Sequence, residues 1–282
     1  MAIWLVLVPI LAAAAAWATP SNRLRPWLLP AGGAVHLALV AHALRAEEVT
    51  ALQRWLQLDP PARVFLGTVS LLFFLCACYA PGYLAQRPER PNRVLCSCLL
   101  LALAAMTLAL LSHHLGLMWV AMESMTLAMA PCVFFNHNAR SLEATWKYLL
   151  VGSVGIALAL LGSFFLAYSS LYTGMESTLL FDDLVAKAPK LSVPWLRAAL
   201  VFLIVGYGTK VGFAPMHTWK PDCYGEAPGL IGALLAGGLT NVGFLGILRF
   251  TQIAHAAGQG EFVRDILMVL GLGSMVIGSV AM

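Results

Sequence analysis

Long apolar runs separated by short polar stretches occupy nearly the whole chain. Each run is roughly 17–28 residues long, and a helix of about 20 apolar residues crosses the hydrocarbon core of a bilayer. The pattern therefore predicts nine membrane-crossing helices. The first five predicted spans cover residues 1–17, 27–44, 64–83, 94–112 and 115–136. The sixth begins at residue 146 and has no charged residue from 148 to 175. The last three cover residues 196–218, 228–249 and 263–282.

The composition supports an all-α polytopic membrane protein. Hydrophobic residues make up 60% of the chain and charged residues 11%, and the mean hydropathy is +0.82, well outside the usual range of soluble domains. The net charge of +4 is modest and the basic residues lie between apolar runs, which argues against a nucleic-acid partner. The odd-numbered loops sum to a net charge of about +4 and the even-numbered loops are near neutral, so we expect the odd-numbered loops in the cytoplasm and the amino terminus outside. No basic residue precedes the first run, so we expect a retained helix and not a secretory signal.

The seventh predicted span contains a lysine among helix-breaking residues, in the stretch VGYGTKVGFAPMHTWKPDCYGEAP. A lysine at mid-membrane depth costs about 2.5–3.5 kcal/mol on insertion scales and usually faces a polar interior. Glycines and prolines leave backbone groups that need partners from elsewhere in the protein or from water. We therefore expect a broken helix around Lys210, and the residues expected to break it are Gly206, Gly208, Gly212 and Pro215.

Glu123 is the only charged residue between 94 and 139 and lies in the fifth predicted span. An isolated intramembrane carboxylate is a functional-site hypothesis by default. Glu123 and Lys210 on neighbouring helices would stabilise each other's charged forms, because either charge alone in a low dielectric is expensive. Two alternatives stay open: Glu123 can be a structural partner without transport, and Lys210 can extend its amine to the membrane interface.

Other polar residues admit simpler explanations. His217 lies near the end of the seventh span and is either a hydrogen-bonded wall residue or a proton relay. Asp222 and Glu226 are expected to cap the eighth helix, and the two adjacent histidines, His113 and His114, to lie at the headgroup boundary. The six cysteines form no metal-binding pattern, and no nucleotide-binding glycine motif or iron–sulfur motif is present, so we expect no cofactor and no metal.

Four segments in order carry a resemblance to a known family: HHLGLMWVAMESMTLAMAP, LEATWKYLLVGSVGIALALLG, GTKVGFAPMHTWKPDCYGEAP and GALLAGGLTNVGFLGILRF. They resemble the antiporter-like membrane subunits shared by respiratory complex I and membrane-bound nickel–iron hydrogenases, which are relatives of multisubunit Na⁺/H⁺ antiporters. The likeness is greatest to component F of hydrogenase-4-type complexes. It extends over nearly the whole chain and is strongest from residue 113 to 250.

The resemblance implies roles for particular residues. The glutamate of the family's fifth helix falls on Glu123 and its broken-helix lysine on Lys210, which implies that this pair gates a proton half-channel. Members of the family often have a lysine or histidine at the position of Asn241. An asparagine cannot exchange a proton near neutral pH but can hold a water. Lys220 stands where an apolar residue is usual, and we explain it only as a loop or partner contact.

The family has about fourteen helices built from two inverted repeats. The resemblance implies three leading helices at 1–93, a first half-channel at 94–253, and the first helix of an incomplete second repeat at 254–282. The chain ends without a polar tail, so we expect a fragment, a protein whose missing half another chain supplies, or a protein that does not transport alone.

These features together imply a proton-translocating subunit that is not catalytic alone. The expected partners are other membrane subunits and a redox module, the expected ions are protons or Na⁺, and the expected location is a bacterial-type inner membrane. Two alternatives remain, a subunit of a cation/proton antiporter and a truncated scaffold that does not transport.

Overall fold

The computed structural model describes residues 1–280 and is built almost entirely of helices. The α-helices are α1 (Ala2–Ala18), α2 (Leu28–Arg45), α3 (Pro60–Ala85), α4 (Arg93–Leu111), α5 (Leu115–Val133), α6 (Ala139–Tyr172), α7 (Phe181–Lys187), α8 (Val193–Val211), α9 (Trp219–Glu226), α10 (Gly229–Leu234), α11 (Thr240–Ala256) and α12 (Gly260–Val280). Short 3₁₀ turns are η1 (Arg25–Trp27), η2 (Phe134–Asn136) and η3 (Ala188–Lys190), and a π-helical segment, η4 (Leu235–Leu239), joins α10 to α11. The strands β1 (Thr50–Ala51) and β2 (Leu56–Gln57) pair antiparallel in a small hairpin.

Seven helical segments of the described residues are long and apolar enough to cross a membrane. A helix occupies each of the nine predicted spans, but α1 is shorter than these seven at 17 residues. Helix α8 contains Arg197 and Lys210 and is not among the seven either. The polytopic all-helical fold is therefore confirmed, whereas nine crossings remain a prediction. The last two residues of the ninth predicted span lie outside the described part of the chain.

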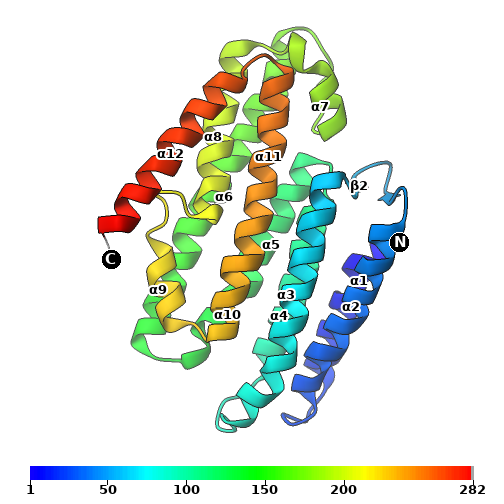
Figure 1. Ribbon diagram of the computed structural model, residues 1–282, viewed down its shortest axis with the longest axis vertical. Helices are drawn as coiled ribbons and strands as arrows, with labels where there is room; N and C mark the ends of the chain where they lie inside the picture. Colours follow the sequence, from blue (N-terminus) through cyan, green and yellow to red (C-terminus); the bar gives the residue numbers. More distant parts are fainter. Residues whose placement is uncertain (281–282) are drawn as a thin grey trace.

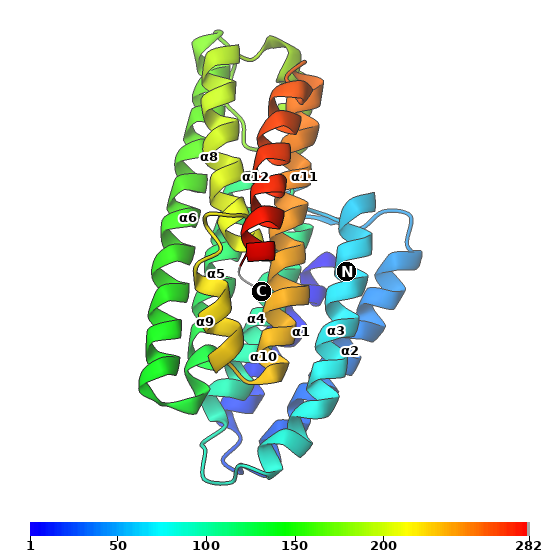
Figure 2. The ribbon, with the colours of Figure 1, turned by 60° about the vertical axis from the view of Figure 1, so that its left-hand side comes forward.

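The helices form an elongated bundle with α4 and α5 in its middle (Figure 1). Helices α1, α2 and α3 lie on one side of this pair, and α6, α8 and α12 lie on the other (Figures 1 and 2). Helix α4 has an almost uniformly apolar sequence, and 78% of its most apolar stretch is buried inside the protein. A helix that is apolar on all sides packs on all sides, so α4 links the leading helices to the site-bearing ones. Helix α12 lies at the edge of the bundle, since only 6% of its most apolar stretch is buried inside the protein.

Local sequence signals explain where the helices begin. Asp59 caps α3 by accepting a hydrogen bond from the Ala62 amide at 2.9 Å, and two prolines occupy the first turn, where no amide hydrogen is needed. Asn138 and Ser141 form a reciprocal capping box at the start of α6. The hairpin and α7 lie at the same end of the bundle (Figure 1), so that end carries several short polar segments.

Candidate proton site in the broken helix

Lys210 lies in the last turn of α8 and is fully buried. Glycines let the neighbouring helices approach it closely. A Cβ added at Gly152 of α6 would lie 2.9 Å from the Lys210 amine, and one added at Gly243 of α11 would lie 3.3 Å from the Lys210 Cβ. The lysine is therefore enclosed between α5, α6 and α11, and its amine does not reach the protein surface.

A seam of small residues holds α6 and α8 together along this stretch. A Cβ added at Gly206 would lie 2.5 Å from the Gly155 carbonyl oxygen, and one at Gly155 would lie 2.7 Å from Thr209. One helical repeat further on, a Cβ at Gly162 would meet Leu203 at 2.8 Å. Small residues at these positions permit the close backbone approach that is common between membrane helices. Gly206, expected at the break, thus serves helix packing, and α8 continues through both Gly206 and Gly208.

The Lys210 ammonium donates a hydrogen bond to the Thr126 hydroxyl of α5. That hydroxyl in turn donates to the Met122 carbonyl at 3.0 Å. The amine also lies 5.9 Å from the centre of the Tyr148 ring, a distance at which the π-face attracts a cation. Each of these partners is neutral, so the ammonium is solvated by dipoles and by the negative end of its own helix.

Glu123 lies one turn before Thr126 on α5 and is half-buried. Its Oε1 accepts a hydrogen bond from the Ser153 hydroxyl at 2.7 Å, and among the described residues its buried Oε2 has no hydrogen-bond partner. The carboxylate does not come within the 4.0 Å of an ion pair with Lys210. It nevertheless lies one turn from Thr126, which binds the ammonium, so the two charges attract through space. The two groups therefore share one polar region, in which the adjacent Gly152 and Ser153 of α6 each contact one of them.

The break in the seventh predicted span begins at Gly212, whose φ of 85° ends α8 in the left-handed conformation. Pro215 follows in a cis peptide with Ala214, and the chain becomes helical again at Trp219. Side chains from α9 close the end of α8, since the Trp219 indole donates to the Thr209 carbonyl at 3.0 Å. These contacts provide the partners that an interrupted membrane helix needs.

The two other predicted relay residues, Asn241 and His217, do not take part in the contact between Lys210 and Thr126. Asn241 lies in the first turn of α11, and its amide donates to the Gly237 carbonyl at 2.7 Å, within the π-helical segment η4. His217 lies in the break itself, where its Nδ1 is buried and has no hydrogen-bond partner among the described residues. Neither side chain hydrogen-bonds to Lys210 or Glu123, so their part in a relay remains a prediction.

A second group of charged side chains, with Arg249 and His113 buried and Asp59 and Asp182 partly exposed, lies near the end of the bundle that carries the hairpin. We name it the Arg249 cluster; its members are Arg249, Asp59, His113 and Asp182. Arg249 of α11 is 1% exposed and donates to the carbonyls of Ser112 and Leu110 at the end of α4. Its other partner is the Asp59 carboxylate, at 3.3 Å.

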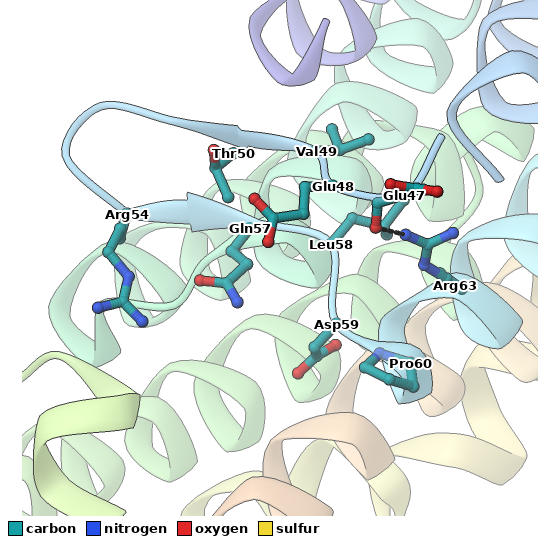
Figure 3. Close-up of a pocket in the computed structure, with 10 residues that line it drawn as sticks. All are labelled: Glu47, Glu48, Val49, Thr50, Arg54, Gln57, Leu58, Asp59, Pro60 and Arg63. Carbon is teal, nitrogen blue, oxygen red and sulfur yellow. Dashed lines mark hydrogen bonds between the residues drawn. The ribbon is translucent and has the colours of Figure 1, made fainter. Parts of the chain in front are cut away.

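His113 lies between the two carboxylates of the cluster, 3.9 Å from Asp59 and 3.6 Å from Asp182. It is 3% exposed and therefore enclosed by protein, and its expected place at the headgroup boundary stays a prediction. Burial and, after it, the nearby Arg249 lower the pKa of His113 from its ordinary value of 6.5, and the carboxylates only partly oppose this. Asp59, one of these two carboxylates, also lines a pocket of about 680 Å³ next to the hairpin (Figure 3).

The expectation that Asp222 and Glu226 cap the eighth helix is wrong. Asp222 lies inside α9 and forms an ion pair with Lys147 of α6 at 2.8 Å. Glu226 is the last residue of α9, and its carbonyl accepts a hydrogen bond from Asn136 at 2.7 Å. These contacts fasten α9, the second half of the broken helix, to η2 and α6.

Some residues of the site could not be read from the sequence. Thr126 could have been predicted from its position, because it stands three residues after Glu123 and so lies on the same helix face. Ser153 and Arg249 had none, since each meets its partner only through the packing of distant segments.

Known proteins resemble this chain in sequence and in fold. The family described as NADH:quinone oxidoreductase/Mrp antiporter, transmembrane, matches residues 112–282. The hydrogenase-4 component F homolog of Methylacidiphilum infernorum is 35% identical over 78% of this chain and 50% of its own. Subunit N of the NADH-quinone oxidoreductase of Deinococcus radiodurans is 30% identical over 91% of this chain and 48% of its own. A solved chain of a membrane-bound sulfane sulfur reductase, an archaeal respiratory membrane complex, superposes with a TM-score of 0.83 at 17% identity, covering 95% of this chain and 56% of that one.

The buried lysine and the broken helix lie within the part of the chain that the family model matches. The chain belongs to the NADH:quinone oxidoreductase/Mrp antiporter transmembrane family. It is a multi-pass membrane protein, and it spans about half the length of the curated relatives it matches.

Proposed function

We propose that this chain is a proton-translocating, antiporter-like membrane subunit of a redox-driven complex, of the NADH:quinone oxidoreductase-like or membrane-bound hydrogenase-like kind. Protons pass through a half-channel whose two titrating groups are Glu123 and Lys210. One observation carries the proposal: a fully buried lysine stands at the end of a broken helix and is hydrogen-bonded to a hydroxyl.

The geometry suits a lysine that must both hold and release a proton. An ammonium locked against a carboxylate in a low dielectric keeps its proton, because the pair attraction stabilises the charged form. Here the Thr126 hydroxyl holds the ammonium, while Glu123 acts on it through space. Moving the carboxylate nearer favours the protonated amine, and moving it away favours release. A small displacement of α5 relative to α8 therefore switches Lys210 between the two states.

The wider assignment follows the family. We infer that the half-channel comprises residues 94–253, with leading helices at 1–93 and the start of a second repeat at 254–282, whose last two residues lie outside the described part of the chain. The relatives named above belong to enzymes or complexes. By analogy, this chain works with other membrane subunits and a redox module in a bacterial-type inner membrane.

The test is proton pumping by the assembled complex. Inverted membrane vesicles carrying Lys210→Met are energised with NADH, hydrogen or formate, and acidification is followed with a pH-sensitive dye. We expect pumping to fall by about a hundredfold, the size of effect that follows loss of a proton-carrying group. Lys210→Arg is expected to assemble and still fail, since a guanidinium does not release its proton. Lys190→Met, at an exposed lysine of η3, is the matched control.

Two other outcomes separate the competing functions. Wild-type pumping by Lys210→Met, with the variant shown to be assembled, would leave a scaffold role. The membership of Mrp antiporters in the family favours a second candidate, a subunit of a cation/proton antiporter. Transport that requires sodium ions, measured as radioactive sodium uptake by the same vesicles, would support that candidate; we expect sodium-independent pumping.

A further inference from the structure

Lys220, the second residue of α9, extends back across the break toward the end of α8. Its ammonium donates to the Val211 carbonyl and lies 3.5 Å from the Thr240 hydroxyl of α11. A Cβ added at Gly212 would lie 2.3 Å from the Lys220 Cε. The side chain therefore passes directly over Gly212, and its amine occupies the space between the end of α8 and the start of α11.

No carboxylate lies within 4.0 Å of this amine among the described residues. Its remaining neighbours are the rings of Trp219 and Tyr224, with centres 5.9 Å away. Lys147 provides a contrast, because it contacts both Glu143 and Asp222 at 2.7 and 2.8 Å. An ammonium that is half-buried and held only by neutral groups gives up its proton more readily than one in an ion pair.

Lys220 is also adjacent to the Lys210 site. The carbonyl that it binds belongs to Val211, the residue directly after Lys210. Helix α11, which carries its other contact, packs against Lys210 at Gly243. The Lys210 amine thus contacts α5 and α6, and the Lys220 amine contacts the end of α8 and the start of α11.

We propose that Lys220 is a second proton-carrying amine, which takes up the proton that Lys210 releases and passes it toward the start of α11 near Thr240. In the transfer the Lys210 ammonium becomes a neutral amine while the neutral Lys220 amine becomes an ammonium, so the total charge of the two groups is unchanged. The proposal rests on the proposed function, because it extends the same path by one step. It also gives Lys220 a role beyond the loop or partner contact expected from the sequence.

The competing explanation is that Lys220 only caps α8. A cation near a helix carboxyl end is stabilising whatever its proton exchange, and the hydrogen bond to Val211 would serve that purpose. The two roles differ in what an arginine can replace. A guanidinium supplies the charge and the donors of a cap, but it does not release a proton at working pH.

The experiment compares Lys220→Arg, Lys220→Met and Lys210→Met in the assembled complex, with Lys190→Met as control. Pumping is measured in inverted vesicles as above, and thermal unfolding of the purified complex is followed by tryptophan fluorescence. We expect Lys220→Arg to unfold at the wild-type temperature and to pump at least about tenfold more slowly. Lys220→Met is expected to lose pumping to a similar degree.

Each outcome bears on one proposal. Near-normal pumping by Lys220→Arg, together with destabilisation by Lys220→Met, would show a cap and overturn the inference. If Lys220→Arg failed to assemble, Lys220→Met would decide: normal pumping by assembled Lys220→Met overturns the inference, and lost pumping with an unchanged unfolding temperature supports it. A complex in which Lys210→Met pumps normally would refute the proposed function itself. Loss in Lys210→Met with normal pumping in both Lys220 variants would refute only the second amine.

Discussion

Buried charge is held in two different ways in this protein. In the Arg249 cluster the arginine contacts the Asp59 carboxylate directly and also donates to carbonyls at the end of α4. At the Lys210 site the ammonium and the Glu123 carboxylate each bind a hydroxyl, from Thr126 and Ser153, and do not contact one another. Direct pairing fixes both charges, whereas separate hydroxyl partners leave each charge free to change. The first arrangement suits a structural fastening and the second suits a switch.

Breaking the direct pair should have the largest effect, and the effect should be on stability. Arg249→Met would leave Asp59 partly buried without its partner and two helix-end carbonyls without a donor, which typically costs about 3–5 kcal/mol. We expect poor assembly and a lower unfolding temperature in detergent. Arg264→Met, which removes an exposed ion pair of α12, should change the free energy of unfolding by no more than about 0.5 kcal/mol. Equal effects of the two substitutions would show that the Arg249–Asp59 pair is not a structural fastening.

Changing the carboxylate of the Lys210 site should affect transport more than stability. Glu123→Gln keeps an acceptor for Ser153 but removes the charge that acts on Lys210, so we expect pumping to fall by about tenfold with little change in unfolding temperature. Glu123→Asp keeps the charge and should be milder. Pumping rates and unfolding curves of the same preparations test this. A large loss of stability in Glu123→Gln would make the carboxylate a structural partner after all.

The hydroxyl that holds Lys210 can be tested with a substitution of nearly equal shape. Thr126→Val removes the acceptor of the ammonium while preserving the packing of α5. A net hydrogen bond is worth about 1 kcal/mol, so we expect pumping to change by about fivefold. Thr126→Ser retains the hydroxyl and serves as the control. Identical rates for the valine and serine variants would show that the hydroxyl has no part in the site.

The smallest expected effect is a pH dependence of stability that arises from His113. Because burial lowers its pKa in the folded protein, the unfolded chain binds a proton below pH 6.5 that the folded protein does not. Stability should therefore fall as the pH drops through 6.5 and continue to fall down to the lowered pKa. Unfolding temperatures measured from pH 8 to pH 5 should show a weaker dependence in His113→Gln. A variant that depends on pH as strongly as the wild type would contradict this.

The sequence predicted the helical membrane fold because apolar runs report burial or lipid contact without knowledge of the partners. It also identified Lys210 and the break that follows, since a charge and helix breakers in an apolar run are visible locally. It misassigned Gly206, because a glycine that packs against another helix looks the same as one that ends a helix. Helix α8 also continues through Gly208, which faces Phe213 and Met216 of the following segment. The sequence also placed Asp222 at a cap, because the partner Lys147 lies on a helix far away in the sequence. Local chemistry was readable and contacts between distant segments were not.

The glycine seam between α6 and α8 has a mechanical consequence. Gly206 packs directly against Gly155 and Ala159. Sliding or rotating one helix past the other would make the two backbones collide, so we expect α6 and α8 to move as one rigid unit. Conformational change is easier in the short segment 212–218, because this segment has no helical hydrogen bonds. Ser274 of α12 holds that segment through the Ala214 amide at 2.9 Å. A displacement of α12 would therefore shift segment 212–218, next to Lys210, while α6 and α8 keep their positions.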